Sequence, residues 1–158
     1  MPPPSTTGLV IVDHGSRRGE SNNMLVELVD RFRRDASSYI AVEPAHMELA
    51  EPTIARAFDR CVAAGAKRVV VMPYFLLPGR HWDQDIPRLT AEAAAKHPGV
   101  EYLVAAPLGL HPLILQVIQS RVERCLAHAA GTAGECDVCE GTGRCVMRMG
   151  GEGSTSPA

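Results

Sequence analysis

Three side chains that can bind a metal ion or accept a proton follow apolar stretches of this 158-residue chain. His14 follows Gly-Leu-Val-Ile-Val-Asp, His81 follows a run that begins Val-Val-Val-Met-Pro, and Glu48 ends a third apolar stretch. In an open α/β sheet, ligands bind beyond the carboxyl ends of the strands, so these groups are expected to meet in one crevice. Two imidazoles and one carboxylate suit a divalent metal ion, and neutral imidazoles also accept protons near neutral pH.

Each histidine also has a structural interpretation. A lone histidine after a strand is more often a hydrogen-bonded structural residue, and His81 can be read as a solvent-exposed loop residue. Gly15 favours a functional role for His14, because a glycine permits a tight turn that lets the ring face a ligand.

The two glutamates of the second apolar stretch are expected to differ in role. Glu51 precedes Pro52, where a carboxylate stabilises the start of a helix. Glu48 is placed on the strand and is the better catalytic candidate. His46 lies two residues earlier, which puts it on the same face of the strand as a secondary candidate.

The apolar pattern alternates between strand-like and helix-like segments. Strands are expected at residues 9–12, 40–49, 68–75 and 100–105, and helices at 21–36, 54–65, 83–96 and 112–129. Four β-α repeats predict an α/β domain, a four-stranded parallel sheet with helices on both faces. The carboxyl edge of that sheet would position His14, Glu48 and His81.

Composition restricts the classes of partner. Hydrophobic residues make up 46% and charged residues 22% of the chain, as in an ordinary globular protein. The formal net charge of -2 gives no basic field, so we expect no nucleic-acid partner. No apolar run reaches the roughly 20 residues that span a bilayer, and the N-terminal residues lack the regions of a secretory signal. We therefore expect no membrane partner and no secretion.

The composition changes beyond Gly131, where Gly, Cys, Thr and Ser replace the apolar pattern. We expect the α/β domain over residues 8–130, a Cys-rich metal-binding extension over 131–150 and a disordered tail over 151–158. The extension holds Cys136, Cys139 and Cys145, a spacing that indicates metal or redox chemistry. A zinc-binding loop and a reversible disulfide between the first two cysteines are both open interpretations.

Several segments together resemble the short class II tetrapyrrole chelatases, a family that includes sirohydrochlorin ferrochelatases and cobalt-inserting relatives. The resemblance covers about residues 8–130. It rests on Asp-His-Gly-Ser-Arg at 13–17, Met-Glu-Leu-Ala-Glu-Pro-Thr-Ile at 47–54, Pro-Tyr-Phe-Leu-Leu-Pro-Gly-Arg-His at 73–81, Asp-Ile-Pro at 85–87 and Pro-Leu-Gly-Leu-His-Pro at 107–112.

The resemblance implies a metal chelatase, a lyase that inserts Fe(II) as its metal substrate into sirohydrochlorin and releases two protons to form siroheme. His14 and His81 would bind the metal and accept protons, and Glu48 would orient a histidine or act as a further base. Arg17 and Arg80 can pair with the carboxylates of the substrate, although each can equally be a solvated surface charge. The resemblance also implies a homodimer.

The cysteine extension resembles that of plant-type sirohydrochlorin ferrochelatases, which implies a [2Fe–2S] cluster on Cys136, Cys139 and Cys145. Cys125 on the last helix is the first candidate for the fourth ligand, and a residue of a dimer partner is the second. Zinc is the alternative occupant. The same resemblance implies the chloroplast stroma as the location, and without it the cytoplasm is expected.

Three other functions are compatible with parts of the sequence. Cobalt insertion on the route to cobalamin uses the same donor types. A non-catalytic metal carrier or redox sensor would depend on the cysteines and leave His14 and His81 dispensable. A histidine phosphatase is disfavoured, because that chemistry requires an arginine where this chain has Asp13.

Overall fold

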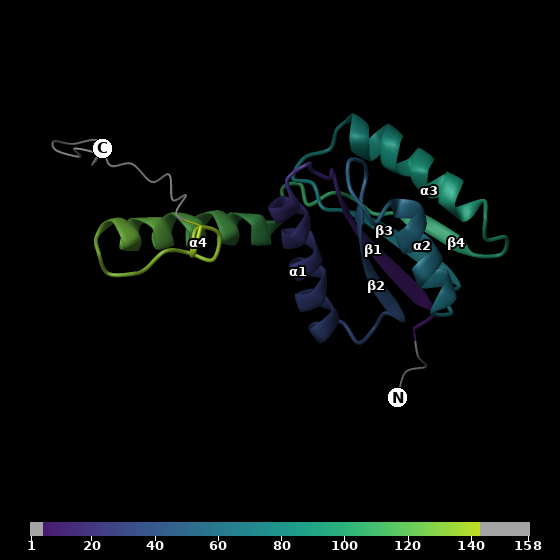
Figure 1. The fold of residues 1–158 in the computed structure, drawn as a ribbon, viewed down its shortest axis with the longest axis horizontal. Helices are drawn as coiled ribbons and strands as arrows, with labels where there is room; N and C mark the ends of the chain where they lie inside the picture. The colour runs from purple at the N-terminus through teal and green to yellow at the C-terminus, as the bar shows by residue number, and fades with distance from the viewer. Residues whose placement is uncertain (1–4, 143–158) are drawn as a thin grey trace. The chain divides into compact units, whose positions relative to one another are not determined.

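The computed structural model of the protein describes residues 5–142. The described residues divide between two compact units, with the boundary between Gly109 and Leu110. The first unit contains the sheet, and the second contains the last long helix and the segment after it (Figure 1). Cys145 and the predicted tail at 151–158 lie outside the described residues, and the predicted boundaries at residues 130 and 150 stay predictions.

The sheet of the first unit has four parallel strands in the order β2-β1-β3-β4. They are β1 (Thr7–Asp13), β2 (Ala41–His46), β3 (Arg68–Pro73) and β4 (Glu101–Val104). The central position of β1 explains its unbroken apolar run, since a strand that is covered on both faces has no solvent side. The predicted four-stranded parallel sheet is confirmed.

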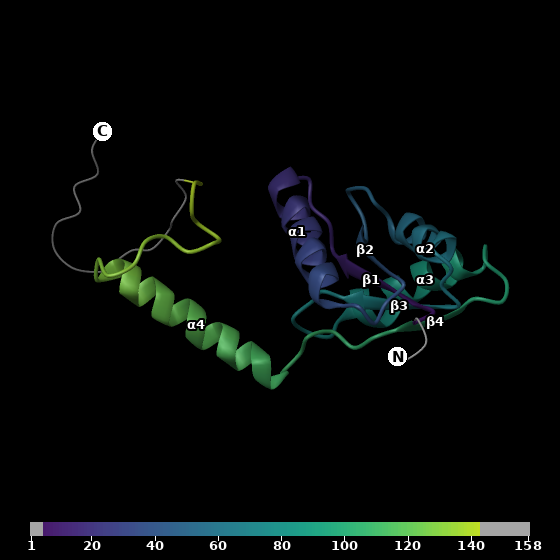
Figure 2. The same ribbon diagram turned by 90° about the horizontal axis from the view of Figure 1, so that it is seen from below.

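Helices cover both faces of this sheet. They are α1 (Gly19–Asp35), α2 (Ile54–Ala63) and α3 (Ile86–Ala94). In both views α1 lies on one side of the strands, whereas α2 and α3 lie on the other (Figures 1 and 2). The prediction of helices on both faces is therefore confirmed for the first unit.

Alternating side chains of β1 build the two halves of the core. Leu9 and Ile11 pack in a cluster with α1, and Val10 and Val12 pack in a second cluster with α2 and α3. Phe58 of α2 is the largest fully buried side chain of that second cluster. Truncating a buried phenylalanine to alanine costs about 3–5 kcal/mol, so this packing stabilises the contact between α2 and the sheet.

Most elements begin or end a few residues from the predicted positions, and two of these differences affect the candidate site residues. The second strand was expected to reach residue 49 but ends at His46, because the chain then turns and His46 N donates to the Pro52 carbonyl at 2.8 Å. Leu49 adopts a φ of 68° in this turn. The helix expected from residue 83 is preceded by a π-helical turn over His81–Asp85, and α3 follows from Ile86, so His81 is not in a loop.

The second unit is built on α4 (Pro112–Ala129), whose bounds match the predicted helix. Its first turn is capped by the His111 ring, whose Nδ1 accepts a hydrogen bond from Leu113 N at 3.2 Å. An ion pair between Arg121 and Asp137 holds the following segment against the helix. Among residues 5–142, no helix combines the length and the hydropathy that crossing a membrane requires.

Candidate active site

The ladder between β1 and β2 continues past the ends of both strands and places His14 beside Glu48. Asp13 is in register with His46, after which Met47 N donates to the Asp13 carbonyl at 2.9 Å and Glu48 N donates to the His14 carbonyl at 3.1 Å. These bonds leave the His14 Nε2 atom 3.2 Å from Glu48 Oε1. The side chains are 44% and 52% exposed, so a ligand can reach both.

The turn that carries His14 requires a glycine. Gly15 has a φ of 88°, and a Cβ atom at this position would lie 1.9 Å from the Glu48 carbonyl oxygen. Gly15 N also donates to Asp13 Oδ1 at 3.0 Å. The glycine thus lets the His14 turn lie directly against the loop that carries Glu48.

The His14 ring lies between two hydrogen-bond acceptors. Its Nδ1 is 3.1 Å from the Gly15 carbonyl oxygen, which can only accept, and this assigns the hydrogen to Nδ1. In the neutral ring Nε2 is then an acceptor that faces the Glu48 carboxylate. Two facing acceptors are stable only when a proton or a metal cation lies between them, so the pair favours a cation.

His81 comes from the π-helical turn that follows β3. Its Nδ1 lies 2.7 Å from Asp85 Oδ2, which leaves Nε2 for another partner. Its ring centroid is 4.8 Å from that of His14, at an interplanar angle of 66°. Trp82 Nε1 donates to the Ala105 carbonyl at 3.0 Å and ties this turn to the segment after β4.

The structure therefore brings His14, Glu48 and His81 together at the carboxyl edge of the sheet. Glu48 lies in the loop after β2, whereas the sequence placed it on the strand. Among residues 5–142, no three His, Cys, Asp or Glu side chains enclose a metal position as they stand. The three donors adjoin one another and remain open to solvent.

The sequence predicted that His46 and Glu48 lie on the same face of one strand, and the structure shows that they do not. The His46 side chain is 1% exposed, and its Nδ1 lies 2.6 Å from Asp13 Oδ1. The expectation failed because the strand ends at His46, so the alternation of side chains does not extend to Glu48.

Arg17 and Arg80 are exposed beside the two histidines in the sequence. Neither forms an ion pair with another residue of the described part of the chain. Leu49, Leu76 and Leu77, in the loops after β2 and β3, are also exposed, at 53%, 62% and 67%. Sequence reasoning missed these leucines and Asp85, although Asp85 lies four residues after His81, a spacing at which helical side chains meet.

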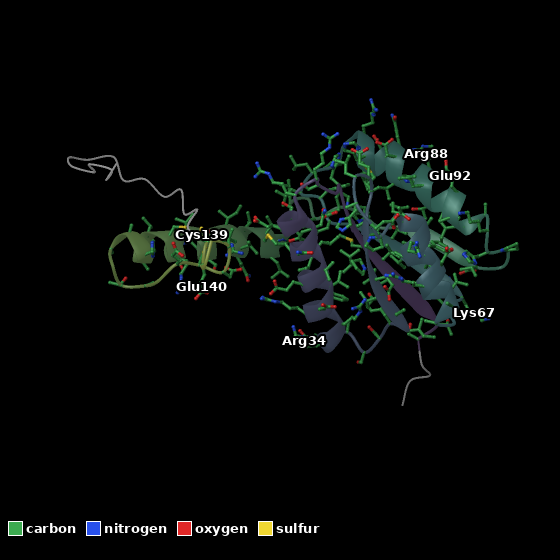
Figure 3. All side chains as sticks on the ribbon, in the orientation of Figure 1. Arg34, Lys67, Arg88, Glu92, Cys139 and Glu140 are labelled. Carbon is green, nitrogen blue, oxygen red and sulfur yellow. The ribbon has the colours of Figure 1, made fainter. Side chains whose placement is uncertain are left out.

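In the second unit, Cys136 lies in a turn that stabilises its thiolate form. The backbone N–H groups of Val138 and Cys139 hydrogen-bond to Cys136 and lower the pKa of its thiol. Cys139, labelled in Figure 3, follows in the same turn, where its N–H donates to the Cys136 carbonyl at 3.0 Å. Metal ions bind thiolates, so this turn suits a metal ligand pair.

The other cysteines differ from this pair. Cys125 is exposed on α4, and it forms no three-ligand group with Cys136 and Cys139 in the described part of the unit. Cys61 of α2 is buried, and burial, with a contribution from Glu43, raises the pKa of its thiol to about 12. Cys61 is thus a small core residue.

The sequence matches the CbiX protein family over residues 8–125. It is 59% identical over 140 residues to a protein of Arabidopsis thaliana named sirohydrochlorin ferrochelatase, chloroplastic, covering 89% of this chain and 62% of that protein. It is 35% identical over 115 residues to a sirohydrochlorin cobaltochelatase of Priestia megaterium, covering 73% of this chain and 37% of that one. The chain therefore spans less than two thirds of the length of these two relatives.

Solved structures share the fold. The sirohydrochlorin chelatase SirB from Bacillus subtilis subspecies spizizenii, in complex with cobalt, superposes with a TM-score of 0.70 and 28% identity, covering 74% of this chain and 50% of that one. A cobalamin-biosynthesis CbiX protein from Marinobacter aquaeolei VT8 gives a TM-score of 0.66 at 28% identity, covering 77% and 98%. The predicted fold class is confirmed.

Proposed function

This chain belongs to the CbiX family, and we propose that it is a metal chelatase that inserts Fe(II) into sirohydrochlorin, releases two protons and forms siroheme. One observation carries the proposal. The Nε2 atom of His14 and the carboxylate of Glu48 face each other as two acceptors beside the ring of His81. The similarity to the chloroplastic sirohydrochlorin ferrochelatase supports iron as the metal.

In this proposal the metal substrate enters between His14 and Glu48. Fe(II) takes the place of a proton between the two facing acceptors. It exchanges water ligands for Nε2 of His14 and Oε1 of Glu48. His81 offers its own Nε2 as a further donor, because Asp85 holds Nδ1. The exposed Glu48 side chain rotates to bring its carboxylate and the two imidazoles around the ion, since as they stand the donors adjoin without enclosing it.

Proton removal uses the same groups. The tetrapyrrole loses two N–H protons and gains one Fe(II), so its charge does not change and the protein passes two protons to water. The Glu48 carboxylate and the imidazoles of His14 and His81 are bases at the place where the ion is bound. Metal delivery and proton acceptance thus share one open edge of the sheet.

Substrate binding combines charge with an apolar surface. Arg17 and Arg80 pair with the carboxylates at the rim of sirohydrochlorin, each through two parallel N–H···O bonds. The exposed Leu49, Leu76 and Leu77 face the apolar plane of the macrocycle. A flat ligand with a charged rim fits this combination.

The decisive experiment is anaerobic insertion of Fe(II), with Co(II) in parallel, into sirohydrochlorin, followed by absorbance. The proposal expects turnover by the wild type and its loss in His14→Ala and His81→Ala. Full activity in both variants, or none in the wild type, would exclude a catalytic role for this site and favour a non-catalytic metal carrier.

Cobalt insertion is the second candidate function. Its support is the 35% identity to a cobaltochelatase and the structural similarity to a chelatase in complex with cobalt. The donor set accepts either ion, because both are borderline first-row metals. The ratio of the Fe(II) and Co(II) rates in the insertion assay ranks the two functions.

For the cysteine extension we propose a [2Fe–2S] cluster, with zinc as the alternative occupant. Cys136 and Cys139 fit such a group as two ligands, because the turn stabilises a thiolate. Cys145, and Cys125 or a residue of a partner copy, would complete the set. The group would supply one-electron redox chemistry. Iron, acid-labile sulfide and zinc measured per chain in the anaerobically purified protein distinguish the occupants.

We also propose a homodimer located in the chloroplast stroma. Leu115, Ile118, Val122 and Leu126 form one stripe of α4 that the rest of the second unit leaves exposed. A stripe of this kind suits a second copy of the chain. Light scattering tests the oligomeric state, and fractionation of chloroplasts tests the location, for which the name of the Arabidopsis relative is the support.

A further inference from the structure

A buried carboxylate–imidazole pair lies behind the candidate active site. His46 and Asp13 are register partners at the ends of β2 and β1, and Nδ1 of His46 is 2.6 Å from Oδ1 of Asp13. The same Oδ1 accepts the N–H of Gly15 at 3.0 Å. One carboxylate oxygen therefore joins the end of β2 to the turn that carries His14.

Packing alone does not account for an imidazole at this position. The carboxylate accepts, so the hydrogen of the neutral His46 ring is on Nδ1. The other nitrogen, Nε2, is buried and has no hydrogen-bond partner among the described residues. An apolar side chain of similar volume would fill the same space without an unpaired polar atom. The distinguishing property of His46 is thus its bond to Asp13.

His46 is itself held firmly. Its side chain is 1% exposed, and its backbone N–H donates to the Pro52 carbonyl at 2.8 Å. A Cβ atom on Gly15 would lie 3.2 Å from the Cβ atom of His46, so the glycine turn rests directly on this residue. The Asp13 side chain is 22% exposed and would be free to rotate toward solvent without this bond.

We propose that His46 is a positioning residue for the metal site, an inference that rests on the proposed function. Its Nδ1–H fixes the Asp13 carboxylate, the carboxylate fixes the Gly15 N–H, and the turn then holds His14 Nε2 at 3.2 Å from Glu48. His46 touches neither metal nor substrate. It acts on the distance between His14 Nε2 and the Glu48 carboxylate, the two groups between which the metal ion enters.

The test compares His46→Asn with His46→Gln. The side-chain N–H of asparagine can take the place of Nδ1–H, whereas that of glutamine reaches one bond further and leaves Asp13 Oδ1 without its buried donor. Val69→Ala is the matched control, because it removes buried volume from β3 and changes no polar group. Each protein is titrated with Co(II) alone under anaerobic conditions, its Tm is measured, and Fe(II) insertion is then assayed.

Positioning by His46 predicts that His46→Gln weakens Co(II) binding about tenfold and lowers kcat. His46→Asn should stay within threefold of the wild type, and Val69→Ala should bind Co(II) normally although its Tm falls. If His46→Gln does not fold, His46→Leu takes its place.

Three results would each overturn the inference. They are equal Co(II) affinity of the Gln variant and the wild type, equal weakening by Asn and Gln, and similar weakening by Val69→Ala. A wild type that binds Co(II) but inserts no metal refutes only the proposed function, since the Co(II) comparison still tests His46.

Discussion

The Oδ2 atom of Asp85 lies 2.7 Å from Nδ1 of His81, within a single π-helical turn. The Gly15 carbonyl holds Nδ1 of His14 in the same way, at 3.1 Å. Both candidate ligands are thus fixed through Nδ1, which leaves Nε2 as the atom that can bind a metal ion. Partners of this kind set the orientation and the basicity of a metal-binding imidazole.

Replacing Asp85 by asparagine is expected to weaken metal insertion with little loss of stability. The amide oxygen can still accept from Nδ1–H, but it lacks the charge of the carboxylate, so the His81 ring is held less firmly and is a weaker metal ligand. The cost should be about 10- to 100-fold in kcat/KM for Fe(II). The measurement is the initial insertion rate over a range of Fe(II) concentrations, with the Tm taken on the same samples.

Asp83→Asn is the control, because Asp83 is exposed on the same turn. It removes one negative charge near His81 without touching Nδ1. If both variants lose the same activity, the general negative charge matters, and the orienting contact does not.

Gly15→Ala is expected to abolish the site. The added Cβ would meet the Glu48 carbonyl oxygen at 1.9 Å, so the turn must open and His14 must leave Glu48. Backbone strain of this kind costs about 1–3 kcal/mol, which chemical denaturation measures, and insertion should fall below detection. Gly19→Ala is the control, because a Cβ there meets no atom within 4 Å and α1 should become slightly more stable. Normal insertion by Gly15→Ala would show that the contact between the loops is dispensable.

The sequence predicts the sheet and the meeting of the site residues for a simple physical reason. Apolar runs mark buried strands, and parallel strands end at one edge, so His14 and His81 are expected on the same edge of the sheet. The exact ends of elements follow from tertiary hydrogen bonds, which no local pattern contains. The bond from His46 N to the Pro52 carbonyl ends β2 early and moves Glu48 into a loop.

The hydrogen-bond partners of the histidines were harder to predict. Asp85 precedes Ile86-Pro87, and its spacing from His81 suits a helix, but the segment before Asp83 was expected to be a loop. The pair of Asp13 and His46 depends on strand register, which a single sequence does not specify.

Cys136 is expected to react with iodoacetamide at a lower pH in the folded metal-free protein than in the urea-unfolded chain. The N–H groups of Val138 and Cys139 lower the pKa of this thiol only while the turn is folded. A lowered pKa means that the thiolate persists as the pH falls, and reactivity is lost only below that pKa. Mass spectrometry of the modified peptides over a pH series measures the shift.

Cys61 is the internal control, because a thiol with a pKa of about 12 should stay unmodified until the protein unfolds. Identical profiles for folded and unfolded Cys136 would contradict the prediction.

Removing Arg17 or Arg80 is expected to raise the KM for sirohydrochlorin and to leave kcat nearly unchanged. Both guanidinium groups are exposed, so each pair with a substrate carboxylate forms near bulk water. Such a pair contributes about 0.2–1 kcal/mol, which corresponds to an increase in KM of up to about fivefold for Arg17→Gln or Arg80→Gln. The effect should shrink as the salt concentration rises, because exposed charges are screened.

Arg34→Gln is the control. Arg34, labelled in Figure 3, lies in the last turn of α1, whereas the His14 turn precedes the first turn of that helix. A loss of kcat at unchanged KM in the Arg17 or Arg80 variant would instead assign that arginine to the metal-insertion step.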